Sequence, residues 1–297
     1  MAFKSIMCVV GGGGSDAVAL NTALSLSHAF GGSLRIVYFS DYPVTPAAYT
    51  YGGSFGAGGL AQSTLESTKR FELQKEIIAS TRKAAVDLAA QHGRKLLDDS
   101  QAVAAEGEIR FKSTMDSVDV GLPNESRTVD LIVAGYDSRA NDNLAPVLVA
   151  LFHSSRPVMV VPRIPGAAFS DSAPKTIAVA WDGSPSASRA VREAIPLLHQ
   201  ASKVWILVTG DEVASADGAS RAEIIAYLLV HGVEAQLAHP LKDGGNIGAV
   251  LLTEASNLGA ELLLMGAYGH GHIAEMVLGG VTSDIVKHTH LPLFLVH

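Results

Sequence analysis

The sequence predicts an α/β protein made of two tandem, doubly wound open parallel sheets, and three observations carry this prediction. Short apolar runs alternate with segments of helical periodicity along the chain. The second half repeats the pattern of the first half. The length of 297 residues exceeds that of one ordinary domain. Strands that alternate with helices favour a parallel sheet covered on both faces, with ligands bound at the carboxyl ends of the strands.

The first half contains the elements of one such unit. Apolar runs of strand length predict buried strands, and apolar side chains three or four residues apart predict helices. Strands are expected over 5–10, 34–39, 102–111, 131–134 and 157–161. Helices are expected over 16–30, 66–92, 118–128 and 147–152. In the helix over 66–92, the stripe expected to pack in the core contains Phe71, Leu73, Ile77, Ile78, Ala84, Ala85 and Leu88.

Three segments of the first half are expected to lie outside helices and strands. Gly11–Gly14 match no nucleotide-binding fingerprint, so a permissive turn is favoured. Residues 41–62 are rich in glycine, proline and aromatic residues and predict a long loop, which either covers a pocket or partner surface or is a plain surface insertion. Residues 164–174 contain two prolines and small side chains and predict a linker.

The second half repeats the first half. The alignment superposes Ile6 on Ile177, Ser15 on Ser186, 131–135 on 262–266 and 157–161 on 292–296. Strands are expected over 176–181, 261–265 and 292–296, and helices over 187–198 and 247–258. A serine among Ser184, Ser186 and Ser188 is expected to cap the helix over 187–198, and Asn246 is expected to lie before the helix over 247–258. Two copies of one unit explain this agreement, with domains at 1–165 and 173–297 related by a pseudo-twofold axis.

Glycines follow the strand over 261–265 at a distinctive spacing. Gly266 is followed by Gly269 after two residues and by Gly279 after nine more, and a helix is expected to begin near Gly280. Glycine lets backbone N–H groups approach an anion, and a helix N-terminus attracts negative charge. Walker A and Rossmann patterns are excluded, because no Gly-Lys-Ser/Thr follows and the connection is too long. The spacing therefore predicts a phosphate-binding loop.

This pattern resembles the ATP-binding signature of the universal stress protein family. The family has Ser or Thr directly after the last glycine, whereas this chain has Gly280, so weaker or altered nucleotide binding is expected. Thr282 and Ser283 are the hydroxyl residues that could replace it. The resemblance covers the chain as a tandem two-domain member. It implies the adenine-nucleotide α-hydrolase-like fold and a stress-associated protein that binds ATP or a related adenine nucleotide, with Mg as an optional companion, as a ligand-dependent switch.

The resemblance also implies the site residues of the second half. Its adenosine contacts carry onto Ala180, Trp181, Asp182 and Val208. Its phosphate-side contacts carry onto Met265, Gly266, Gly269, His270, Gly279, Gly280, Val281 and Thr282. A carboxylate at a strand end can accept a hydrogen bond from a ribose hydroxyl or an adenine amino group, which suits Asp182. The indole of Trp181 either stacks on the ligand or fills the core.

The first half departs from the family pattern where the ligand would bind. Gly11 stands in place of Asp182, and the segment after Gly135 lacks the later glycines. The first domain is therefore expected to be a degenerate scaffold. In the family the closing strand is the usual dimer edge, so the strands over 157–161 and 292–296 are expected to pair inside the chain as an intramolecular pseudo-dimer, with a homodimer as a further option.

Composition excludes several other classes of protein. The net charge of −7 argues against nucleic-acid binding, and no apolar run reaches the length of a membrane span. The single cysteine, Cys8, cannot form an intrachain disulfide and is expected to be buried. The first residues lack the pattern of a signal peptide, so a cytoplasmic protein is expected.

Two rival functions remain at the level of the sequence. The first is a slow ATPase or nucleotidyltransferase in the same pocket, with Asp182 or Asp284 near the phosphates, although no catalytic residue or metal ligand is assigned. The second is a dimerisation protein that binds no nucleotide. The three histidines near the end, His288, His290 and His297, are expected to be solvated, since they lack metal-ligand spacing.

Overall fold

A computed structural model describes residues 2–40, 57–98, 107–138, 144–169, 172–208, 221–238, 246–267 and 280–297. Most of the loop expected over 41–62 lies outside these residues, as do Gly269, His270 and Gly279. Within the described part of the chain, no helix has both the length and the apolar character needed to cross a membrane.

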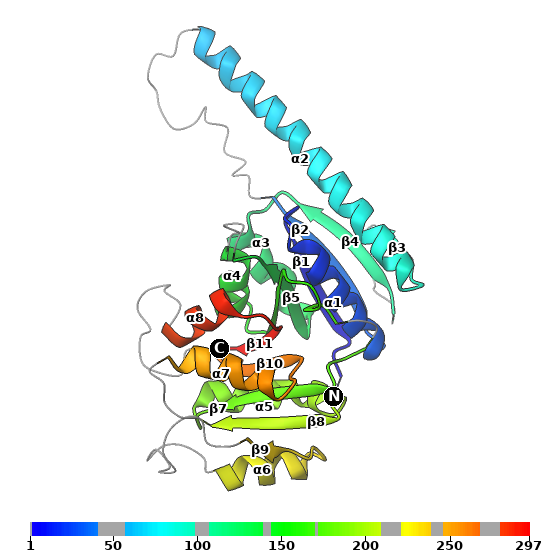
Figure 1. Ribbon diagram of the computed structural model, residues 1–297. Helices are drawn as coiled ribbons and strands as arrows, with labels where there is room; N and C mark the ends of the chain where they lie inside the picture. Colours follow the sequence, from blue (N-terminus) through cyan, green and yellow to red (C-terminus); the bar gives the residue numbers. More distant parts are fainter. Residues whose placement is uncertain are drawn as a thin grey trace.

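One sheet of 11 strands runs through the molecule (Figure 1). Its strands are β1 Ser5–Val10, β2 Ser33–Phe39, β3 Leu96–Asp98, β4 Ile109–Thr114, β5 Leu131–Tyr136, β6 Val158–Pro162, β7 Thr176–Trp181, β8 Lys203–Val208, β9 Gln236–Leu237, β10 Leu262–Gly266 and β11 Leu293–Val296. Their order is β3-β4-β2-β1-β5-β6-β11-β10-β7-β8-β9. All neighbours are parallel except β6 and β11. The predicted α/β fold with two parallel halves is confirmed.

The two halves join through their closing strands, as the sequence predicts. β6 and β11 pair antiparallel, with Leu293 opposite Val160 and Phe294 opposite Met159. On either side of this pair the strands repeat in mirrored order, with β5, β1 and β2 on one side and β10, β7 and β8 on the other. The pairing satisfies the backbone groups of two edges that would otherwise be open.

A chain that ends after Pro165 is expected to self-associate. Such a fragment keeps the buried apolar strand β6 but loses β11, so the backbone groups of β6 become an open edge for another copy. Light scattering after size-exclusion chromatography measures the mass of the fragment and of the full chain. A fragment that stays monomeric at high concentration would contradict the role given to this edge.

Helices cover both faces of the sheet. They are α1 Asp16–Ala29, α2 Ala57–Gln91, α3 Val118–Glu125, α4 Ala145–His153, α5 Pro185–Leu198, α6 Arg221–Val230, α7 Ile247–Asn257 and α8 Gly280–His288. One layer of buried apolar side chains lies between the sheet and α1, α2, α5 and α6. A second layer lies between the opposite face and α3, α4, α7 and α8. This is the doubly wound arrangement that the alternation of strands and helices predicts.

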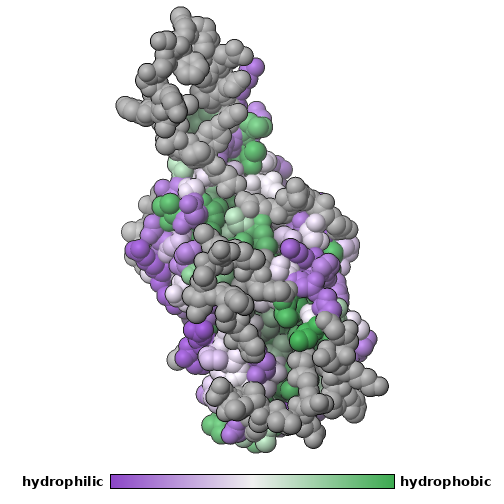
Figure 2. Space-filling model, turned by 90° about the vertical axis from the view of Figure 1, so that its left-hand side faces the viewer, coloured by the Kyte–Doolittle hydropathy of each residue, from purple (hydrophilic) through white to green (hydrophobic). Residues whose placement is uncertain are grey.

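The helix α2 differs from the prediction at its N-terminal end. It begins at Ala57, so residues 57–62 are helical rather than part of the expected loop. In the stripe assigned to the core, Ala85 is buried, but Phe71 is 48% exposed and Leu73 is 56% exposed. The reason is visible in the fold: the N-terminal part of α2 extends beyond the sheet (Figure 1), and hydrophobic side chains reach the surface where it leaves the body (Figure 2).

The strands before β5 also differ from the prediction. The strand expected over 102–111 begins at Ile109 and continues to Thr114, while 101–106 lie outside the described residues. The short strand β3, which pairs parallel with β4, was not predicted. Three residues are too few to show a period in the sequence, which explains the omission.

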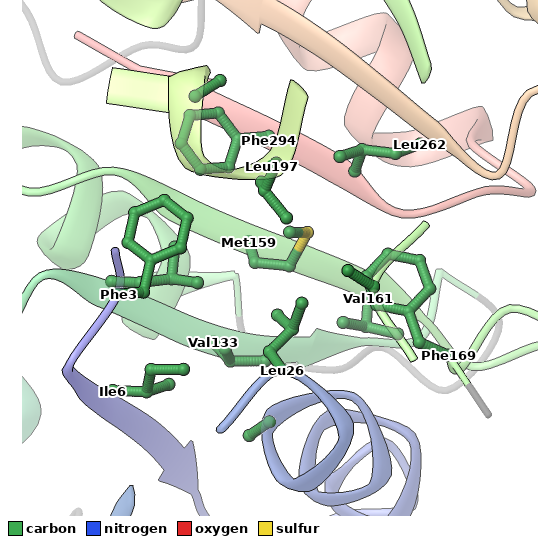
Figure 3. Packing of buried hydrophobic residues seen from close by; sticks show 14 of the residues in the cluster. Phe3, Ile6, Leu26, Val133, Met159, Val161, Phe169, Leu197, Leu262 and Phe294 are labelled. Carbon is green, nitrogen blue, oxygen red and sulfur yellow. The ribbon is translucent and has the colours of Figure 1, made fainter. Parts of the chain in front are cut away.

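The core is continuous across the two halves. Figure 3 shows Leu26 of α1, Met159 and Val161 of β6, Phe294 of β11 and Leu197 of α5 packed in one cluster. The segment expected to be a linker contributes to the same cluster: Phe169 is buried, and its carbonyl oxygen accepts a hydrogen bond of 2.8 Å from Ser25 Oγ. The described parts of this segment, 164–169 and 172–174, therefore pack against the core through Ala167, Phe169 and Ala173.

Cys8 is fully buried in β1, as predicted. Burial, followed by the nearby charge of Asp16, raises the pKa of the Cys8 thiol well above its usual value. Since the thiolate is the reactive form, this cysteine is an inert part of the core near neutral pH.

Candidate functional site

Three adjacent strands of the second half end at the same edge of the sheet. The register pairs Ala180 of β7 with Met265 of β10, and Trp181 with Val208 of β8. Neighbouring strands lie about 4.8 Å apart, so these ends are close in space. The structure thus brings together the predicted adenosine contacts and the first two phosphate-side residues, Met265 and Gly266.

The edge between β7 and β10 is a topological switch point. The chain leaves β7 for α5, which packs on one face of the sheet, and leaves β10 for α8, which packs on the other face. Where successive connections diverge in this way, α/β sheets bind their ligands. Asp182 and Gly266 lie on the two sides of this point.

The turn after β7 presents the carboxylate of Asp182. Gly183 has a φ of 72°, a left-handed conformation that favours glycine. Asp182 is exposed, and its Oδ1 accepts a hydrogen bond of 2.9 Å from the Ser184 N–H. Ser184 Oγ in turn accepts a hydrogen bond of 3.1 Å from the Ala187 N–H and caps α5, which confirms the predicted serine cap. Among the described residues, Asp182 Oδ2 has no hydrogen-bond partner.

The end of β10 requires a glycine. A Cβ at Gly266 would lie 2.4 Å from the Ala187 backbone nitrogen and 2.5 Å from the Ser186 carbonyl carbon. The first half repeats this contact, because a Cβ at Gly135 would lie 2.3 Å from the Ser15 carbonyl oxygen. The strand end therefore packs against the first turn of a helix in both halves, which supports the internal repeat at the level of single atoms.

Trp181 is a core residue of the second half. It is 6% exposed and packs with the buried residues beneath α5 and α6. Its indole Nε1 is buried and has no hydrogen-bond partner among the described residues. Of the two roles weighed for this side chain, filling the core agrees with the structure. Val208 beside it is half-buried.

The helix α8 begins at Gly280, as predicted. Val281 is 40% exposed in its first turn, whereas Thr282 is only 4% exposed. Ser283 is half-buried, so it is the more accessible of the two hydroxyl residues that could replace the missing one. The remaining phosphate-side residues, Gly269, His270 and Gly279, lie outside the described residues.

Asp284 lies in α8, on the side that faces α7. Its Oδ1 lies 3.0 Å from His288 Nδ1, and its Oδ2 lies 2.9 Å from the Cβ position of Gly248 in the first turn of α7. The carboxylate thus lies near a histidine of its own helix and close to the backbone of α7 at Gly248. Within the described ranges there is no group of three or more His, Cys, Asp and Glu side chains that could hold a metal ion.

The three C-terminal histidines are exposed, as predicted. His290 contacts Ser256 of α7. The ring of His297 lies 5.0 Å from that of Phe152, edge to face. Asn246 caps α7 by accepting a hydrogen bond of 3.0 Å from the Ala249 N–H, as expected from its place before this helix.

The equivalent turn of the first half carries a carboxylate that the sequence comparison missed. Gly12 has a φ of 79°, so the predicted permissive turn is confirmed. Asp16 Oδ1 and Oδ2 accept hydrogen bonds of 3.2 and 2.7 Å from the Gly11 and Gly12 N–H groups. A carboxylate therefore lies at this turn in both halves, although Gly11 replaces Asp182. The signal in the sequence was an acidic residue in the first turn of a helix.

The fold and the site define a tandem, doubly wound α/β protein. Each half has a topological switch point, the position at which sheets of this kind bind ligands. Residues 174–297 match the model of the universal stress protein family. The C-terminal half of the chain therefore belongs to the universal stress protein family. No curated protein matches the chain in sequence.

Several solved structures match the chain over nearly its whole length. A universal stress protein from Archaeoglobus fulgidus DSM 4304 has a TM-score of 0.59 at 16% identity, with 98% of this chain and 95% of that chain covered. A functionally unknown protein from Pseudomonas aeruginosa PAO1 has a TM-score of 0.52 at 12% identity, with 99% and 92% covered. At these identities the likeness shows the fold of both halves, the adenine-nucleotide α-hydrolase-like architecture that the resemblance implied.

Proposed function

We propose that the second unit, residues 173–297, binds ATP or a related adenine nucleotide and that binding acts as a switch in a stress-associated regulatory protein of the cytoplasm. One observation carries the proposal: the exposed Asp182 carboxylate and Gly266, the first glycine of the G-x2-G-x9-G pattern, lie on the two sides of the switch point. The unit over 1–165 serves as a scaffold and as the other half of the pseudo-dimer.

The two ends of the ligand would meet different chemistry at this edge. Asp182 Oδ2 can accept from a hydroxyl or amino group, and Val208 offers a half-buried apolar surface next to it. On the other side, the glycines and the N-terminus of α8 supply backbone donors for phosphates. A metal ion such as Mg would be held by the phosphate oxygens of the nucleotide, because backbone N–H groups and an apolar side chain are not metal ligands.

A switch is favoured over an ATPase by the charges near the glycine pattern. No Lys or Arg lies between Met265 and Asp284, so no cationic side chain of this stretch is available to stabilise the charge that develops in phosphoryl transfer. Asp284, one of the two carboxylates considered for an enzyme, lies 3.0 Å from His288 Nδ1. Sustained release of phosphate by the wild-type protein with magnesium would reverse this preference.

Replacing Asp182 with alanine is expected to weaken ATP binding. The loss of a hydrogen bond to a charged acceptor costs about 1 to 3 kcal/mol, which is roughly a 5- to 150-fold rise in Kd. Calorimetric titration measures the change, and Glu193→Ala, which removes a carboxylate from the outer side of α5, is the matched control. If the Asp182→Ala protein binds ATP as tightly as the control, Asp182 does not contribute to the binding site.

A further inference from the structure

The switch point of the first half, between β1 and β5, is filled by side chains of the chain itself. The carboxylate of Asp16 accepts hydrogen bonds from the N–H groups of Gly11 and Gly12. Across the turn, the buried Asp137 carboxylate accepts a hydrogen bond of 3.0 Å from Arg163 Nη1. This guanidinium lies against the same turn, because a Cβ at Gly14 would be 2.5 Å from Arg163 Nη1. An anionic ligand would meet the Asp16 carboxylate and the Asp137–Arg163 ion pair here.

The helix α2 lies over the same turn. A Cβ at Gly12 would lie 2.3 Å from Ile77 Cγ2 and 3.7 Å from Thr81 Oγ1, so α2 touches the backbone at the end of β1. One turn earlier in α2, Gln74 Nε2 donates a hydrogen bond to Ser40 Oγ, directly after β2. The ends of β1 and β2 are therefore both in contact with one helix.

Tyr38 completes the closure of this edge. It pairs in register with Val10 in β1, just as Val208 pairs with Trp181 in the second half. Tyr38 is 4% exposed, whereas Val208 is half-buried. The position that offers an apolar surface in the second half is thus covered in the first half.

We propose that α2 is an intramolecular occupant of the first switch point, which keeps nucleosides and similar small molecules out of it. Ile77 covers the turn after β1, Gln74 binds the residue after β2, and Asp16 satisfies the backbone donors that a ligand would use. A ligand would have to displace the helix and expose the side chains packed beneath it, which opposes binding. The inference concerns the first half and stands apart from nucleotide binding in the second half.

Two glycines with the same backbone conformation test the contact in the full chain. Gly12 and Gly107 both have a φ of +79°, but only a Cβ at Gly12 meets α2, whereas nothing lies within 4 Å of a Cβ at Gly107. In hydrogen exchange, Gly12→Ala is expected to speed the exchange of amides in 71–85 by about tenfold, and Gly107→Ala to leave them unchanged. Adding Ile77→Ala to Gly12→Ala is expected to restore protection, because the clashing methyl is gone. Equal exchange rates of the amides in 71–85 in Gly12→Ala and Gly107→Ala would contradict the contact between Gly12 and α2.

A second pair of variants tests exclusion of a ligand and remains informative if Gly12→Ala does not fold. Ile77→Asp places a charge over the turn and next to Asp16, while Leu73→Asp changes an exposed position of the same helix. After irradiation with 8-azidoadenosine, peptides of the first half are expected to be labelled in Ile77→Asp and not in Leu73→Asp or the wild type. Labelling of the first half in the wild type would overturn the proposal, as would a loosened α2 without new labelling. Labelling of the second half is read from other peptides and reports on the proposed function separately.

Discussion

Replacing Gly266 with alanine is expected to destabilise the protein by more than about 2 kcal/mol and to abolish nucleotide binding. The added Cβ would lie 2.4 Å from a backbone nitrogen and 2.5 Å from a backbone carbon of α5, and neither atom can move without shifting the helix. The shift would separate the two sides of the switch point. Urea unfolding measures the stability, and calorimetric titration with ATP measures the binding.

Variants of two other glycines serve as controls for this prediction. Gly11→Ala introduces a Cβ with no atom within 4 Å, so stability is expected to change by less than about 0.5 kcal/mol. Gly135→Ala creates the equivalent clash in the first half, 2.3 Å from the Ser15 carbonyl oxygen. It is expected to destabilise as much as Gly266→Ala while leaving nucleotide binding intact. Loss of binding in Gly135→Ala, or retention in Gly266→Ala, would contradict the assignment of the site to the second half.

Replacing Phe294 with alanine is expected to cost about 3 to 5 kcal/mol of unfolding free energy. Phe294 is completely buried, lies 6.3 Å from the ring of Phe3 and pairs with Met159 across the junction of the two halves. The cavity would therefore weaken both halves together. Urea unfolding should show one transition with a lowered midpoint.

Leu229→Ala is the control for the cavity, because Leu229 is 62% exposed on α6 and is expected to change stability by less than about 0.5 kcal/mol. A Phe294→Ala protein that unfolds in two separate transitions, or loses less than about 1 kcal/mol, would contradict the single core that Figure 3 shows.

The strands of this fold could be predicted because strands buried on both faces appear as continuous apolar runs, such as β1 and β10. The repeat, together with the closing strand that is the dimer edge in the family the chain resembles, then predicted the pairing of β6 with β11. The exposed stripe on α2 could not be predicted, since periodicity defines a helix face but not whether a sheet lies beneath it. The early start of α2 was hidden by Gly58 and Gly59, which favour a loop.

The sequence predicts the parts of the candidate site that depend on residues close together in the chain. It does not predict the parts that depend on contacts between distant segments. The spacing of glycines and the place of Asp182 after a strand follow from the sequence alone. Whether Trp181 faces a ligand or the core depends on which face of β7 it occupies, which the sequence does not show. The side chain of Asp16 folds back to the turn at Gly11, five positions earlier, where the second half has Asp182. The contact of Ile77 with Gly12 joins segments far apart in the chain, which no local pattern shows.

Titration of ATP into the full-length chain and into the variant Gly269→Val tests the central claim most directly. The wild type is expected to bind about one nucleotide per chain, because the glycine pattern follows β10 and not β5. Gly269→Val is expected to bind none, since a branched side chain would occupy the space between backbone and phosphate. A stoichiometry of about two, or binding that survives Gly269→Val, would contradict a single site in the second half.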